Sequence, residues 1–95
     1  MRIFFLRWFL VPLLPKPLVQ LVAAGAVRVV VAVGQPGGWM LLVRYGLAER
    51  ALAAQRSKQL RVFRKLDTLQ AYLQEIGVVR FEIDAAGFVV APRQR

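Results

Sequence analysis

The sequence contains no cysteine and no histidine, and it has one serine and one threonine among 95 residues. Without cysteine the chain can form neither disulfides nor thiolate metal sites, so its fold depends on packing alone. Nucleophilic catalysis needs a hydroxyl or thiol beside a base, and Ser57 lies in a basic turn without an evident base. Thr68 fits the first residue of a helix. We therefore expect no enzymatic activity, no metal and no cofactor.

Acidic residues are also scarce. Five acids face 14 basic residues, which gives a net charge of +9, and 11 of the basic residues are arginine. A charge of this sign favours association with phosphate backbones or anionic lipid. Glu82 and Asp84 lie two positions apart on one strand face and could share a hard cation such as Mg²⁺. A solvated face that pairs with Arg80 explains these two acids more simply.

The chain lacks an uninterrupted hydrophobic run of the roughly 20 residues that a transmembrane helix needs. Residues 1–33 are very apolar, but four basic residues and three prolines interrupt them: Arg2, Arg7, Pro12, Pro15, Lys16, Pro17 and Arg28. The prolines predict a stiff, extended connector within an N-terminal arm, residues 1–25. The arm could pack on the domain or on a second copy, or form a loose leader. A signal peptide and a membrane-surface anchor formed by residues 1–22 are the alternatives.

The domain proper is expected at residues 26–91. Residues 26–33 (AVRVVVAV) are rich in β-branched side chains, and residues 39–45 (WMLLVRY) read as a return strand. Gln35-Pro36-Gly37-Gly38 between them is typical of a turn. No Lys-Ser/Thr pair follows these glycines, so the segment is not a phosphate-binding loop.

Residues 47–55 are ambiguous, because their Ala, Leu, Glu and Arg content favours a helix. We favour a strand that turns at residues 56–59 and pairs with residues 60–63, which would otherwise need another partner.

The C-terminal part has a clearer pattern. Asp67 is a predicted N-cap with Gln70 three residues on, and Gly77 ends the helix. Leu69, Leu73 and Ile76, flanked by Tyr72, share one helical face. Residues 78–84 alternate as a strand, with Val79, Phe81 and Ile83 on one side. A turn at residues 85–87 could lead to a short strand at residues 88–90, and residues 92–95 form a basic tail.

Seven basic residues between positions 44 and 65 face one acid, Glu49. In the predicted hairpin, Arg56 and Lys58 lie at the tip. On the second arm, Arg61 and Lys65 share one side with Phe63, and Arg64 lies on the other side. Such a surface gives affinity and salt dependence but little sequence choice. The candidate contacts, to a protein partner or to the DNA backbone, are Arg44, Arg56, Lys58, Arg61, Arg64 and Lys65.

The segment AAQRSKQLRVFRKLDTLQAYLQEIGVVRFEID resembles the ParC-like, partition-associated accessory proteins of plasmids and integrative elements. The resemblance covers the second half of the chain and follows its basic turn, its K-L-D helix start, its I-G stop and the strand ending F-x-I-D. It implies a non-enzymatic accessory role in maintaining a bacterial mobile element, and it identifies no functional residues.

Together these observations predict one α+β domain: an antiparallel sheet of four or five strands with one packed C-terminal helix. We expect a cytoplasmic bacterial protein that binds a protein partner or DNA and can form a homodimer. A membrane-surface protein anchored by its N-terminal arm is the alternative.

Overall fold

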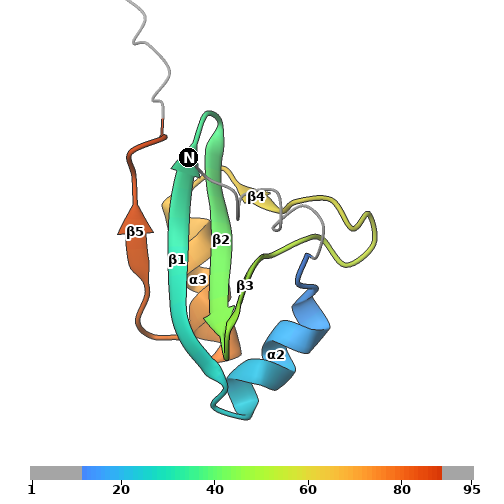
Figure 1. Ribbon diagram of the computed structural model, residues 1–95. Coiled ribbons are helices and arrows are strands. Elements are labelled where there is room, and N and C mark those ends of the chain that lie inside the picture. The colour runs from blue at the N-terminus through green and yellow to red at the C-terminus, as the bar shows by residue number, and fades with distance from the viewer. Residues whose placement is uncertain (1–11, 89–95) are drawn as a thin grey trace, which may run out of the picture.

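A computed structural model describes residues 12–88 of the chain (Figure 1). The elements follow one another as α2 (Pro15–Ala23), β1 (Val27–Gln35), β2 (Gly38–Tyr45), β3 (Ala48–Ala51), β4 (Val62–Phe63), α3 (Leu66–Ile76) and β5 (Glu82–Asp84). The strands form one five-stranded sheet in the order β3-β2-β1-β5, and β4 also pairs with β2. The predicted α+β class and the packed C-terminal helix are confirmed.

The β1–β2 hairpin is the centre of the sheet and confirms the strand–turn–strand prediction. Its antiparallel register pairs Val31 with Leu42 and closes at Gln35 opposite Gly38. Gly37 takes a φ of +91°, which a residue with a side chain rarely adopts. The turn residues therefore fix where the chain reverses, and the β-branched run of β1 lies beside the apolar run of β2.

The ambiguous segment does contain a strand, because β3 pairs with β2 through Leu42–Ala51 and Arg44–Glu49. The predicted return arm is only partly right. One antiparallel bridge joins Ala53 to Leu60, but β4 pairs with β2 rather than with β3. This pairing places Phe63 in the core beside Trp39. Burial of the Phe63 ring favours pairing of β4 with β2 over continued pairing with the segment that follows β3.

The sheet has two apolar faces. The helix face packs against α2 and α3 and holds the main cluster: Leu13, Leu18, Val30, Ala32, Trp39, Leu41, Val43, Leu52, Phe63, Leu69 and Leu73. The opposite side, called the second face from here on, consists of Val31, Met40, Leu42 and Ala51 with the partly buried Val29, Val33 and Leu60 around them. Strand residues alternate between these two clusters, as the period of two requires.

The predicted extended connector at the prolines is wrong, because Pro15–Ala23 forms the helix α2. Pro15 opens the helix and Pro17 stays within its first turn, where backbone N–H groups have no intrahelical partner and proline costs nothing. Leu18 is fully buried in the helix face, and Leu13 joins Leu52 through a parallel bridge. Leu13 and α2, within the range expected for the arm, therefore pack against the sheet.

The N-cap assigned to Asp67 is also wrong. Lys65 is the cap residue of α3 and makes no side-chain cap hydrogen bond, so Asp67 is the second helical residue and Gln70 completes no capping box. Asp67 still lies in the first turn, where a negative charge interacts well with the helix dipole. The buried Leu69 and Leu73 and the left-handed Gly77 at the helix end confirm the rest of the prediction.

The last described strand differs from the prediction in direction and length. Helix α3 carries the chain back to the end of the sheet where β1 starts, so β5 runs parallel to β1 and the sheet is mixed (Figure 1). Only Glu82–Asp84 are paired, and the Val79 and Ile83 side chains are 82% and 52% exposed.

Several predictions concern residues 1–11 and 89–95, which lie outside the described part of the chain. They include the far end of the N-terminal arm, most of the strand at residues 88–90, and the basic tail. Within residues 12–88, neither helix has the length and apolar content to cross a bilayer. The division into an arm, a domain and a tail stays a prediction.

Candidate binding surface

Five of the six predicted contact residues lie on one continuous stretch between β3 and α3. This stretch is called the basic edge, and it consists of Arg56, Lys58, Arg61, Arg64 and Lys65. All of them except the half-buried Arg61 are exposed. Among residues 12–88 the single ion pair joins Arg44 to Glu49, so no described acid neutralises the basic edge.

The tip of the basic edge is an ordered turn. The backbone N–H of Ala54 donates to the carbonyl of Gln59 at 2.8 Å, and that of Lys58 donates to Ala54 at 3.0 Å. Lys58 has a φ of +61°, and its Nζ donates to the Gln55 carbonyl at 3.1 Å. Ser57 Oγ accepts a hydrogen bond from the N–H of Gln59 at 3.2 Å. The only serine of the chain therefore supports the turn, as Ser side chains commonly do.

Arg61 holds the middle of the edge against the core. Its guanidinium carbon lies 4.4 Å from the centre of the Phe63 ring and 5.9 Å from that of Tyr72. A guanidinium in this range is attracted to the ring face. Phe63 is 2% exposed, so the stacked Arg61 ties the basic edge to a fixed point of the helix face. The predicted sharing of one side by Arg61 and Phe63 is what the structure shows.

Arg64 and Lys65 stand at the start of α3. The N-terminus of a helix is the positive end of its dipole, so cations there gain nothing from the helix. Both side chains are exposed, and the acidic Asp67 beside them lies within the helix itself. The folded structure therefore gives these two charges no stabilising role.

Tyr72 lies behind the edge and carries a buried hydroxyl. Its oxygen has no hydrogen-bond partner among the described residues. Burial raises the pKa of the Tyr72 phenol, with Arg61 lowering and Glu75 raising that pKa by smaller amounts. A buried polar atom without a partner lowers the stability of the fold by the lost solvation.

Replacing Tyr72 with phenylalanine is expected to keep or raise the free energy of unfolding at neutral pH, by up to about 1 kcal/mol, because it removes that orphan hydroxyl. The raised pKa also makes folding favour the protonated phenol. Its contribution is complete below the unfolded pKa of about 10 and is lost as pH rises through the folded pKa. Urea unfolding should therefore show the parent losing stability relative to Tyr72→Phe above about pH 10. Tyr45→Phe, which removes the hydroxyl of a half-buried tyrosine, is the matched control.

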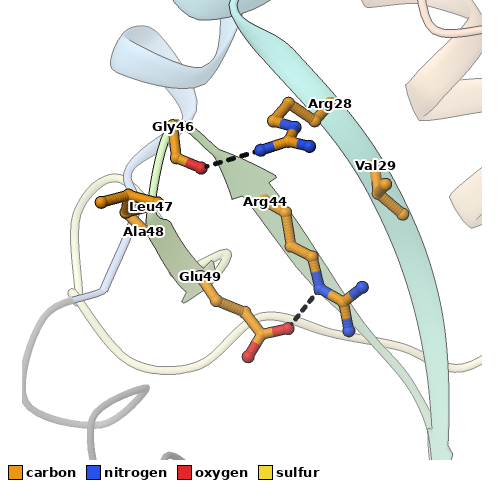
Figure 2. A pocket seen from close by; sticks show the side chains of 7 residues that line it. All are labelled: Arg28, Val29, Arg44, Gly46, Leu47, Ala48 and Glu49. Atoms are coloured by element: carbon orange, nitrogen blue, oxygen red, sulfur yellow. Dashed lines mark hydrogen bonds and ion pairs between the residues drawn. The ribbon is translucent and has the colours of Figure 1, made fainter.

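The sixth predicted contact, Arg44, lies elsewhere. It is five positions along β2 from Trp39, the residue opposite β4, which corresponds to about 17 Å of strand. Arg44 Nε donates to Glu49 Oε2 within a shallow pocket at the far end of the hairpin (Figure 2). Its charge is therefore neutralised locally, and it does not join the basic edge.

Arg28 lines the same pocket and was missed by sequence reasoning. It lies in a β-bulge, since Val27 pairs with Tyr45 and Val29 with Arg44, and a bulge redirects the extra side chain. Arg28 Nη1 donates to the Gly46 carbonyl at 3.5 Å (Figure 2). The hairpin register could have placed Arg28 near Arg44, but the bulge has no sequence signature here.

The two acids considered for Mg²⁺ binding lie on the exposed strand β5. No group of three or more possible metal-ligating side chains occurs within residues 12–88. Asp84 Oδ1 accepts a hydrogen bond from the Ala86 N–H at 3.2 Å, so this carboxylate stabilises the turn that follows.

Comparisons with known proteins give one result. A family model described as ParC-like matches residues 13–93. The match covers both helices and all five strands, so the limitation of the resemblance to the second half of the chain is wrong. Searches of curated proteins and of solved structures found no match.

Proposed function

The chain belongs to the ParC-like family, and on that premise we propose that it is a small non-enzymatic accessory binding protein of a bacterial mobile element, with a role in partition or maintenance. Two observations support a binding role. The family model covers nearly the whole described domain. The basic edge carries positive charges that form no ion pair with an acid of residues 12–88.

The proposed contact is between the basic edge and the phosphate backbone of DNA. The observation that carries it is the exposure of Arg56, Lys58, Arg64 and Lys65 without an acid partner in residues 12–88. The cations in the turn and those at the start of α3 can each contact phosphate groups of the DNA backbone. Contacts of this kind supply affinity and salt dependence and leave the sequence unread.

Removing two charges from the basic edge should weaken DNA binding. Fluorescence anisotropy with a labelled duplex, repeated over a series of salt concentrations, measures both the affinity and its salt dependence. Each phosphate contact contributes about 0.9 to the slope of log affinity against log salt, so Arg64→Gln with Lys65→Gln should lower that slope by roughly 1–2. The matched control is Arg28→Gln with Arg80→Gln, which removes the same charge elsewhere and should lower the slope less.

An anisotropy titration that stays flat at low salt would contradict the proposed DNA contact. Equal losses of affinity in both double variants would show that binding depends on net charge and not on the basic edge.

A protein partner is the second candidate, and one observation favours it. The edge strand β5 exposes Ile83, Val79 is exposed in the segment before it, and an edge strand with apolar side chains is disposed to pair with another chain. A pull-down from the host with and without nuclease separates the candidates, because only a direct protein contact survives the nuclease.

A further inference from the structure

The second face of the sheet is buried. Met40 and Leu42 are 3% exposed, Val31 is 7% exposed and Ala51 is completely buried. These side chains come from β1, β2 and β3 and form one continuous apolar cluster. A sheet buries an apolar face by packing it against another layer, so burial of this degree calls for a cover.

The described elements do not supply that layer. The buried helix residues Leu18, Leu69 and Leu73 all belong to the helix-face cluster. Within residues 12–88 the second-face cluster contains strand residues and the loop residue Leu60, and no helix residue. Figure 1 shows α3 on one side of the hairpin only. Within residues 12–88, no helix therefore packs on the second face.

We propose that the second face binds residues 1–11 of the same chain. The point where the described chain begins favours this occupant. The Leu13 N–H donates to the Ala51 carbonyl at 2.9 Å and the Leu13 carbonyl accepts from the Ala53 N–H at 2.8 Å, so the described part of the chain begins along the free edge of β3. Ala51 is itself a member of the second face. Eleven residues reach up to about 36 Å, which exceeds the roughly 14 Å across four strands.

The composition of the segment matches the face. Residues 1–11 (MRIFFLRWFLV) contain nine apolar side chains and two charges, Arg2 and Arg7. Burying such side chains on an apolar sheet face is strongly favourable. A second copy could offer the same segment, but the tether of a few residues makes the local segment far more concentrated.

The acids at the rim of the second face add charge complementarity. Glu82 and Asp84 are in register with Val31 and Val33, so they share the side of the sheet that carries the second face. No cation in residues 12–88 forms an ion pair with either acid. Arg2 and Arg7 supply positive charges to this rim, and this pairing gives the segment a preferred placement.

Cysteine accessibility tests the proposal, because the chain has no cysteine of its own. Leu42→Cys reports on the second face, Leu41→Cys on the helix face, and Leu47→Cys on a position that is 100% exposed. In the full chain a thiol reagent should modify Cys at position 42 at least about tenfold more slowly than at position 47. Serine replacements of the aromatic residues in the segment should remove that protection. They are Phe4→Ser, Phe5→Ser, Trp8→Ser and Phe9→Ser.

The helix-face probe keeps the result interpretable. If the serine replacements speed the reaction at position 42 but leave position 41 slow, the segment covers the second face and the fold persists. Reaction at position 42 as fast as at position 47 in the full chain would overturn the proposal. So would protection that the serine replacements leave intact, and so would protection that vanishes on dilution, since that result assigns the cover to a second copy.

Discussion

Replacing Leu73 with alanine is expected to lower the free energy of unfolding by about 2–5 kcal/mol. Leu73 is completely buried and lies in the helix-face cluster, where it anchors α3 to the sheet. The substitution removes buried methyl and methylene groups and leaves a cavity that the surrounding strands cannot close. A domain this small has a total stability of the order of 5–15 kcal/mol, so the loss is a large share of it.

Urea unfolding followed by circular dichroism measures this effect, and Leu47→Ala is the matched control. Leu47 is fully exposed in the turn between β2 and β3, so the same chemical change there should stay within about 0.5 kcal/mol. Equal midpoints for Leu73→Ala and the parent would mean that α3 does not pack on the sheet as described.

The β1–β2 hairpin and α3 could be predicted because local and tertiary preferences agree in both. The β-branched run at residues 27–33 favours a strand on its own, and burial on both faces of the sheet rewards the same choice. In α3 the spacing of Leu69 and Leu73 and the stop at Gly77 indicate the same helix. The start of α3 was predicted wrongly, because Asp67 is a favourable cap residue but lies two residues after the actual cap, Lys65.

Other elements depended on contacts that the sequence does not encode locally. Proline breaks a helix when it lies in the interior but is tolerated in the first turn, so the sequence around Pro15 and Pro17 fits either a break or a helix start. Burial of Leu18 against the sheet favours the helix start. The direction of β5 follows from the path of α3 across the sheet. A period of two predicts a strand in either direction, so alternation could not distinguish a parallel from an antiparallel partner.

The candidate site was predictable as a charged stretch but not as a surface. Arg56, Lys58, Arg64 and Lys65 are close in sequence, and the structure places the first two in a turn and the last two at the start of α3, with β4 between them. Arg44 seemed to extend the stretch, but the register of β2 and β3 places Glu49 beside it and neutralises it. Pairing across strands decides which charges are free, and that pairing emerges only with the fold.

Replacing Gly38 with alanine is the second substitution with a large expected effect. A Cβ at this position would overlap the carbonyl oxygen of Phe63 and lie 2.8 Å from Val62 Cγ1. The carbonyl belongs to backbone, so it cannot turn aside as the end of a side chain could. Strand β4 would have to separate from β2, at a cost of about 2–3 kcal/mol or more.

Gly37→Ala separates this clash from backbone strain. Gly37 has a φ of +91° and open space around it, so alanine there should cost only about 1 kcal/mol. Denaturant unfolding should therefore rank the parent above Gly37→Ala and Gly37→Ala above Gly38→Ala. Because β4 carries Phe63 and Arg61 stacks on that ring, Gly38→Ala should also displace the middle of the basic edge. If Gly38→Ala kept full stability, β4 would not lie against the start of β2. The position described here for the middle of the basic edge would then also be wrong.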